Sequence, residues 1–175
     1  MALSDLDYAL LGLLFATPRS GYELRKVFQT TLLSAYSDSP GSIYPALRKL
    51  ETSRHVTGTA AEDGRGRRTL RPTAKGKRAL VAWLESPITA ELLTRDSAGV
   101  SLRLAFVSDV APRRFRPMLV EYRAALLTRL ADVDAARRAL DPQLSPSARA
   151  AVDLGAHVLR ARADWCAKAL GERAS

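Results

Sequence analysis

A chain of 175 residues has room for one ordinary domain or for two small ones that share a core. Apolar residues make up 47% of it, which is enough to bury a core and excludes an intrinsically disordered protein. No apolar run approaches the roughly 18 to 20 residues that a membrane-spanning helix needs, and residues 1–5 show no basic start of a secretory signal. The single cysteine, Cys166, excludes an internal disulfide. We therefore expect a cytoplasmic protein of bacterial type without membrane association.

The net charge of +9 is concentrated in one fifth of the chain. Residues 48–82 contain 10 basic and 3 acidic side chains, whereas residues 1–47 contain 3 and 4, and residues 83–175 contain 14 and 11. A local excess of this kind is typical of a surface that binds a polyanion such as nucleic acid. The alternative is an ordinary solvated face in a chain that uses Arg rather than Lys, but compositional bias does not explain why the cations cluster.

The spacing of apolar residues predicts two helices near the start of the chain. The first covers residues 5–16 and is capped by Ser4 or Asp5. After a break that contains Pro18 and Gly21, the second is expected over residues 22–32.

A third helix is expected over residues 40–52. Its inward positions, four and three residues apart, are Ile43, Leu47 and Leu50. The residues left on its other faces are Ser42, Tyr44, Pro45, Arg48 and Lys49. Pro45 must lie in the first two turns, because a later proline would remove a hydrogen bond and clash with the preceding turn. Ser39 and Ser42 are both candidate caps.

A β-hairpin and a fourth helix follow. Residues 55–61 and 67–71 can form strands, and residues 62–66 between them form a turn with two glycines. Thr73 is expected to cap a helix over residues 74–84. The hairpin carries four arginines, Arg65, Arg67, Arg68 and Arg71.

Beyond a boundary at Ser86 and Pro87 the rest of the chain is predicted to be helical. A short buried helix is expected over residues 98–107, and two long amphipathic helices over residues 113–140 and 147–170 form a helical hairpin. The fold class is therefore mainly α with a small β-hairpin.

The order helix, helix, helix, hairpin, helix is that of a winged helix-turn-helix. A major groove about 12 Å wide admits one helix, and the third predicted helix offers a hydroxyl, a phenol and two cations on its exposed side. The arginines of the wing suit phosphates or the adjacent minor groove. A basic amphipathic helix alone is usually a solvated face, but these features in this order predict DNA binding. The predicted contacts are Ser42, Tyr44, Arg48, Lys49, Arg65, Arg67, Arg68 and Arg71.

Five motifs resemble the PadR family of bacterial transcriptional regulators. They are YALLGLL (8–14), SGYEL (20–24), GSIYPALRKLE (41–51), DGRGRR (63–68) and TAKG (73–76). The resemblance is close over residues 1–85, and the remaining residues resemble the longer helical tail of the larger PadR subfamily more loosely. It implies a homodimer joined through its C-terminal helices and repression that a small-molecule effector relieves. It also places Ser42, Tyr44 and Arg48 on the family's recognition helix.

The sequence departs from the family pattern in two places. The family usually has a glycine and an aliphatic residue where this chain has Arg54 and His55. The second wing strand usually has a tyrosine at the position of Leu70 and a leucine at the position of Pro72.

We expect a DNA-binding domain over residues 1–85 and a dimerisation and effector domain over residues 86–175. The operator is expected to be an inverted repeat in double-stranded DNA, because a two-fold dimer presents two recognition helices. The alternative function is a winged-helix adaptor whose basic face binds an acidic protein, and a third is a ligand-storing or enzymatic helical bundle. No enzyme activity, cofactor or metal site is expected, because the sequence offers no cluster of titratable groups at catalytic or ligand spacing.

Four other side chains carry specific expectations. Trp83 and Trp165 are candidate effector contacts, because some PadR relatives stack flat aromatic ligands on a tryptophan; a core or interface role is the favoured alternative for each. Tyr22 is expected to pack inside the protein. Arg162 lies on an apolar stripe, where it either pairs across an interface with an acid such as Asp134 or Asp132 or extends its charged end to water.

Overall fold

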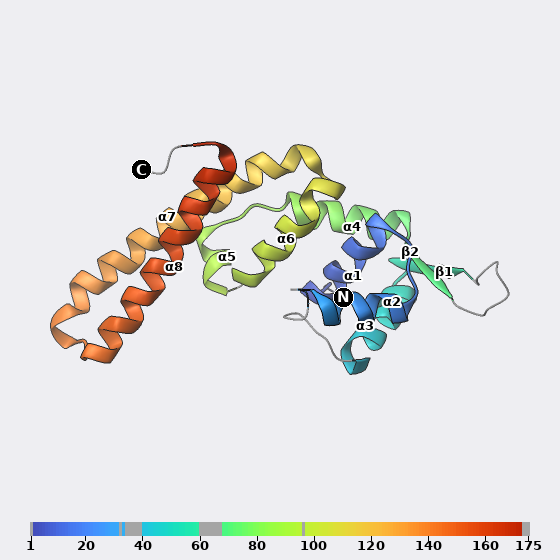
Figure 1. The fold of residues 1–175 in the computed structure, drawn as a ribbon, viewed down its shortest axis with the longest axis horizontal. Coiled ribbons are helices and arrows are strands. Elements are labelled where there is room, and N and C mark those ends of the chain that lie inside the picture. The colour runs from blue at the N-terminus through green and yellow to red at the C-terminus, as the bar shows by residue number, and fades with distance from the viewer. Residues whose placement is uncertain (1, 32, 34–39, 60–67, 96, 173–175) are drawn as a thin grey trace. The chain divides into compact units, whose positions relative to one another are not determined.

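The computed structural model describes residues 2–31, 33, 40–59, 68–95 and 97–172 (Figure 1). The chain divides into two compact units. The first consists of Met1–Glu85 and Ala105–Pro112, and the second of Ser86–Leu104 and Arg113–Ser175.

The first unit is a winged helix-turn-helix, as the sequence predicted. Its elements in chain order are α1 (Asp5–Ala16), α2 (Gly21–Thr30), α3 (Pro40–Thr52), β1 (Val56–Thr59), β2 (Thr69–Pro72) and α4 (Ala74–Glu85). The two strands are antiparallel, with Val56 opposite Pro72 and Thr59 opposite Thr69. Helix α2 begins and ends earlier than the predicted 22–32, and α3 has the predicted bounds.

Side-chain caps determine where three of these helices begin. Ser4 and Asp7 form a capping box at α1, and Ser20 and Glu23 form another at α2, so each pair satisfies main-chain donors that the first turn leaves free. Thr73 caps α4 as predicted, because its Oγ1 accepts from the main-chain nitrogen of Gly76 at 3.1 Å. Ser42 lies inside α3 and is not its N-cap, and Ser39 lies outside the described residues.

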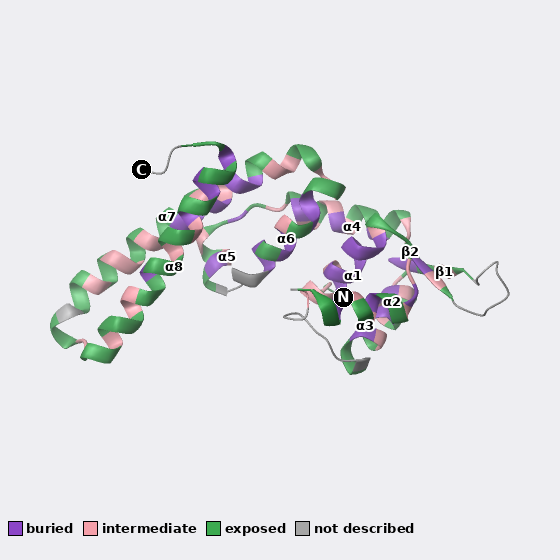
Figure 2. Ribbon diagram, viewed as in Figure 1, coloured by how far each residue is buried: buried purple, intermediate pink, exposed green. Residues whose placement is uncertain are grey.

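The core of the first unit lies between its helices and its two strands, which contribute Val56 and Leu70 (Figure 2). Its largest fully buried side chains are Leu10, Leu11, Leu14, Leu24, Phe28, Ile43, Leu50, Leu80 and Leu84. The predicted inward positions of α3 are therefore confirmed, since Leu47 is also buried. On α1, Gly12 leaves room for Phe106, because a Cβ at this position would lie 2.6 Å from the phenylalanine ring.

The second unit is a helical hairpin with two shorter helices. Its long helices are α7 (Phe115–Leu140) and α8 (Pro146–Leu170), which pack on each other as predicted. Helix α5 (Ala90–Arg95) was not predicted from the sequence, and α6 (Ser97–Val110) contributes residues to both units.

A bidentate ion pair fastens the start of the second unit to α7. The Arg114 guanidinium lies 2.6 and 2.7 Å from the two carboxylate oxygens of Glu121, and the main-chain nitrogen of Ile88 also donates to this carboxylate at 3.1 Å. The hydrogen bond from Arg114 keeps the pKa of Glu121 below its usual range. The carboxylate therefore holds two chain segments that lie more than 30 residues apart in sequence.

Helix α3 ends in a conformation that usually requires glycine. Arg54 has φ 59°, in the left-handed region. Its main-chain nitrogen donates to the carbonyl of Glu51 at 2.9 Å, and that of His55 donates to the carbonyl of Leu50 at 2.8 Å, which is the hydrogen-bond pattern of a Schellman cap. The chain therefore retains the cap despite having arginine where the PadR pattern has glycine, and it carries the conformational strain of a side chain there.

We predict that Arg54→Gly stabilises the protein by about 1 kcal/mol. Glycine removes the conformational penalty that a side chain has in the left-handed region, and its greater backbone entropy in the unfolded state cancels only part of this gain. The measurement is urea unfolding at a fixed protein concentration. Arg54→Ala is the matched control, since it removes the same charge but keeps a Cβ, and its stability should stay within about 0.5 kcal/mol of wild type. An equal gain in both variants would mean that charge, rather than backbone strain, is responsible.

Candidate nucleic-acid interface

The outward face of α3 carries the side chains predicted to contact bases. Ser42 and Arg48 are exposed and Tyr44 is half-buried. They lie on the faces of the helix that the buried stripe of Ile43, Leu47 and Leu50 leaves free. Pro45 lies in the second turn of α3, within the first two turns where the sequence analysis placed it. The arrangement presents polar and cationic groups along one side of a helix that the core holds rigidly on the other.

The basic side chains of this unit differ in their exposure and in whether they form ion pairs. Arg48 and Arg71 are exposed and form no ion pair with any residue in the described part of the chain. Arg68 is exposed but forms an ion pair with Glu51 of α3, with 2.7 Å between Nη2 and Oε1. The predicted contacts Arg65 and Arg67 lie outside the described residues.

Lys49 is held inside the fold. Its Nζ lies 2.5 Å from Oδ2 of Asp7, a carboxylate that is only 1% exposed, and 3.4 Å from the main-chain oxygen of Ala2. The same Asp7 oxygen accepts from the main-chain nitrogen and the hydroxyl of Ser4. The ammonium therefore neutralises a buried charge and ties α3 to the start of α1.

A hollow beside α3 contains a residue that sequence analysis placed wrongly. The cavity measures about 480 Å³ and is lined by Ser20, Gly21, Tyr22, Tyr44 and Arg68. Tyr22 was expected to pack, but its side chain is 60% exposed. The spacing could have shown this, because the buried stripe of α2 runs through Leu24 and Phe28 and a residue two positions before Leu24 lies off it.

Gly21 allows Tyr44 to lie close to the first turn of α2. A Cβ on Gly21 would lie 2.9 Å from Cε1 of Tyr44, closer than side-chain carbons approach. The hollow thus brings together α2, the recognition helix and the wing, and places two phenols next to an arginine. A phosphodiester, which accepts hydrogen bonds and carries one negative charge, suits such a lining.

His55 serves the fold of this region. It is buried after α3, and its Nδ1 lies 2.8 Å from the hydroxyl of Ser53. Burial, followed by the charge of Lys75, lowers the pKa of His55. Among the described residues, no group of three or more His, Cys, Asp or Glu side chains is placed to hold a metal ion.

The first unit also matches a known protein family. Residues 10–82 match the model of the Transcriptional regulator PadR-like family, beginning within α1 and ending within α4. These residues are similar to that family over a length that includes α2, α3 and both strands. The match bears out the resemblance seen in the sequence motifs of this part of the chain.

Solved structures of PadR-like regulators are similar to this chain at low identity. BC1756 from Bacillus cereus is 19% identical over 97% of this chain and 96% of that chain, with a TM-score of 0.45. Bacillus subtilis PadR in complex with operator DNA is 21% identical over 98% and 99%, with a TM-score of 0.46. The same protein in complex with p-coumaric acid is 21% identical over 96% and 98%, with a TM-score of 0.41. Curated proteins include no match to the chain.

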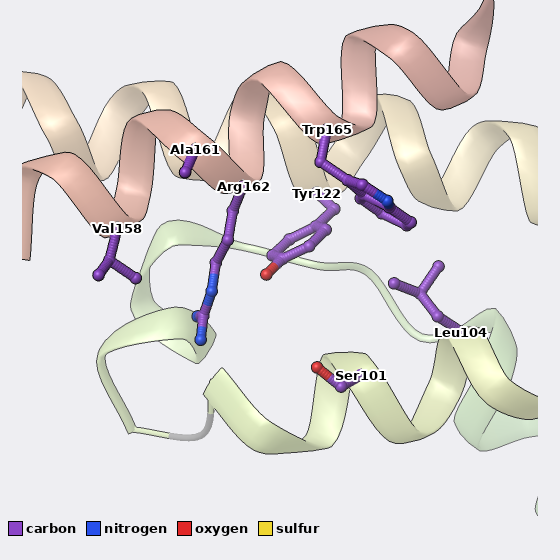
Figure 3. A pocket seen from close by; sticks show the side chains of 7 residues that line it. All are labelled: Ser101, Leu104, Tyr122, Val158, Ala161, Arg162 and Trp165. Atoms are coloured by element: carbon purple, nitrogen blue, oxygen red, sulfur yellow. The ribbon is translucent and has the colours of Figure 1, made fainter. Parts of the chain in front are cut away.

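The two tryptophans occupy different surroundings. Trp83, which lies in α4, stacks on Tyr8 with ring centroids 4.4 Å apart and planes 8° apart. Trp165 belongs to the second unit, is 48% exposed and lines a cavity there (Figure 3). Trp83 therefore has an aromatic partner within its own unit, whereas the indole of Trp165 has a large uncovered surface.

No helix in the described ranges combines the length and the apolar character that crossing a membrane requires.

We predict that Lys49→Met destabilises the protein by about 1–3 kcal/mol, because it leaves the buried Asp7 carboxylate without its cation. Arg48→Met is the matched control on the neighbouring, exposed position and should change stability by less than about 0.5 kcal/mol. Thermal and urea unfolding measure both. The double variant Asp7→Asn/Lys49→Met should recover part of the loss, and equal melting of the two single variants would refute a structural role for Lys49.

Proposed function

We propose that the protein is a transcriptional regulator that binds double-stranded DNA by inserting α3 into the major groove. The observation that carries the proposal is the division of α3 into a buried stripe and an outward face with Ser42, Tyr44 and Arg48. Arg48 is suited to a guanine, which offers two acceptors in the major groove. A regulator of this kind acts on chromosomal DNA in the bacterial cytoplasm.

The remaining cations are proposed to contact the DNA backbone. Arg71 and Arg68 extend from the described part of the wing, and Arg65 and Arg67 are predicted to join them. Tyr22 joins this set, since its exposed phenol borders the hollow with Arg68 and Tyr44. Lys49 stays a predicted contact whose charge Asp7 already neutralises in part.

We further propose a homodimer formed by the C-terminal helices. Large apolar side chains are exposed along α7 and α8: Val120, Leu127, Leu140, Leu154, Val158 and Trp165. In Figure 2 most residues of α7 and α8 that lie near the turn between the two helices are coloured as exposed. Covering this surface with a second copy would remove it from water and would place two α3 helices on an inverted repeat.

In this proposal residues 1–85 bind DNA and residues 86–175 mediate dimerisation and respond to an effector. Residues 105–112 lie within the first unit, where Phe106 packs against Gly12, so they contribute to the DNA-binding part. We propose that the DNA-bound protein represses transcription and that binding of the effector relieves this repression.

We predict that Arg48→Ala weakens binding to a preferred duplex by about 1–3 kcal/mol, because it removes a base contact. The duplex is obtained by selecting random-sequence DNA with the wild-type protein, and binding is measured by fluorescence anisotropy on the selected and on a scrambled duplex. Arg68→Ala is the contrast: it should weaken binding to both duplexes and lower the salt slope by roughly one unit, as a lost phosphate contact does.

Three outcomes would contradict the proposal. If the selection yields no sequence above non-specific binding, the basic face is better explained as a docking surface for an acidic protein. If Arg48→Ala binds the selected duplex like wild type, α3 does not read bases. If Arg48→Ala melts early, the residue is structural.

We predict that Leu154→Glu dissociates the dimer, because it places a charge on an apolar side chain that is 67% exposed in the single chain. Sedimentation velocity at several concentrations measures the shift to monomer. His157→Glu is the control, since it adds the same acid at an exposed position of α8 whose described hydrogen bond is to its own helix, at Asp153. Dissociation by both variants, or by neither, would argue against a contact at Leu154.

A further inference from the structure

A buried histidine lies where α3 ends and the wing begins. The side chain of His55 is only 8% exposed. Its main-chain nitrogen donates to the carbonyl of Leu50 at 2.8 Å, which closes α3, and its carbonyl accepts from the main-chain nitrogen of Thr73 at 2.9 Å, just before α4. Strand β1 begins at the next residue, Val56. His55 therefore connects α3, the wing and the start of α4.

The hydrogen bond of the imidazole fits its neutral form. Nδ1 lies 2.8 Å from the hydroxyl of Ser53, and this hydroxyl donates to the carbonyl of Lys49 at 2.7 Å. Because a hydroxyl has one proton to donate, it accepts from Nδ1, and Nδ1 carries the hydrogen of the neutral ring. A second proton would be added at Nε2, for which the described residues provide no hydrogen-bond acceptor. The charged ring would thus carry a donor without a protein partner.

The charges around the ring also disfavour its protonation. Lys75 of α4 donates to the main-chain oxygen of Ser53 at 2.8 Å, and both this lysine and Lys49 of α3 act against a second cation. Asp7 of α1 acts in its favour, but this carboxylate already pairs with Lys49. Burial first, and then the charge of Lys75, therefore lower the pKa of His55, and the amino terminus adds a smaller effect in the same direction.

A lowered pKa makes the folded unit sensitive to mild acid. In the unfolded chain the imidazole takes up a proton as the pH falls through about 6.5, whereas the buried ring of the folded chain takes it up only at lower pH. The unfolded state then binds more protons, so the free energy of unfolding falls as the pH drops below about 6.5. Carboxylates, whose usual pKa values lie near 4, stay ionised through most of this range.

We propose that His55 makes the first unit a pH sensor: the neutral ring holds α3 and the wing together, and its protonation loosens this junction and lowers the affinity for DNA. A charged ring regains water by leaving the core, which disturbs the residue whose main-chain nitrogen closes α3. The aliphatic side chain that the PadR pattern has at this position could fill the space but could not titrate. The proposal rests on the proposed function in one respect, since DNA affinity is its output.

The test measures binding of the full-length protein to its selected duplex by fluorescence anisotropy at constant ionic strength. The two conditions are about pH 7.5 and about pH 5.5, which bracket the titration of histidine. The proposal expects binding at least about threefold weaker in acid. General electrostatics predicts the opposite sign, because protonated histidines make the protein more positive and DNA attracts it more strongly. Unchanged or tighter binding in acid therefore overturns the proposal without any variant.

Two variants assign the effect to one side chain. His55→Asn does not titrate, and its amide nitrogen can donate to Ser53 in place of Nδ1, so this variant should lose the weakening in acid. His157→Asn is the matched control, because it removes the other histidine of the chain, which is exposed on α8, and it should keep the weakening. A loss in acid that His55→Asn retains, or that His157→Asn abolishes, contradicts the assignment. If His55→Asn does not fold, His55→Leu takes its place with the same expected outcome.

Measurements without DNA separate the failure of the sensor from the failure of the proposed function. The NMR signal of the His55 ring, assigned by its absence in His55→Asn, should titrate below about pH 6.5. The midpoint of urea unfolding should fall in acid for wild type more than for His55→Asn.

If both results hold in a protein that selects no DNA sequence, the acid-sensitive junction stands and the proposed function is refuted. If the protein selects a sequence but its stability does not respond to pH through His55, the sensor alone is refuted. A response in stability that leaves the DNA affinity unchanged refutes the link between the junction and DNA.

Discussion

The first unit depends on the close approach between the first turn of α4 and the main chain that leaves α3. A Cβ on Gly76 would lie 2.1 Å from the carbonyl oxygen of His55, so only glycine fits there. Thr73 completes the contact, since its main-chain nitrogen donates to the carbonyl of His55 at 2.9 Å and its hydroxyl to that of Arg54 at 2.7 Å. The end of α3 and the start of the wing are therefore fixed to the same end of α4, as the proposed joint contact of α3 and the wing with one DNA surface requires.

The ion pair between Asp7 and Lys49 ties α3 to α1. It also changes which basic side chains count toward the surface charge of the unit. Counted along the sequence, residues 48–82 have 10 basic side chains. In the structure one of these neutralises a buried carboxylate and another, Arg68, pairs with Glu51. Exposed pairs of the second kind are worth little and exchange readily for a phosphate, whereas a pair with a buried acid does not. The cations on the wing and on the outward face of α3 are thus the ones that the proposed DNA contact would use.

Much of the fold could be predicted because it follows from periodicity. Ile43, Leu47 and Leu50 show a helical stripe in the sequence, and the same stripe is buried in the structure. Helix α5 was missed because six residues span fewer than two turns, too few for a period to appear. Its start depends on the Thr89 hydroxyl, which accepts from the main-chain nitrogen of Leu92.

The environments of individual polar side chains were harder to predict than the elements that carry them. Lys49 lies on the outward side of α3 by spacing, but its partner Asp7 is 42 residues away in sequence, and no local pattern connects them. For Arg162 the sequence left two alternatives open, an ion pair across an interface and a charged end extended to water. Its side chain is half-buried and forms no ion pair with any residue in the described part of the chain, so both alternatives stay predictions. Long-range packing decides such cases, because it sets which charges lose water and which find a partner.

Helix α6 is divided between the two compact units, since Leu104 and the residues before it belong to the second unit and Ala105 and the residues after it to the first. Within the first unit its Phe106 packs against Gly12 of α1, where a Cβ would lie 2.6 Å from the phenylalanine ring. Even a methyl group at position 12 would therefore overlap the ring, and α1 or Phe106 would have to move to accommodate it. The core of the first unit thus depends on a residue that follows the boundary at Ser86 and Pro87, which no local pattern in residues 1–85 could have shown.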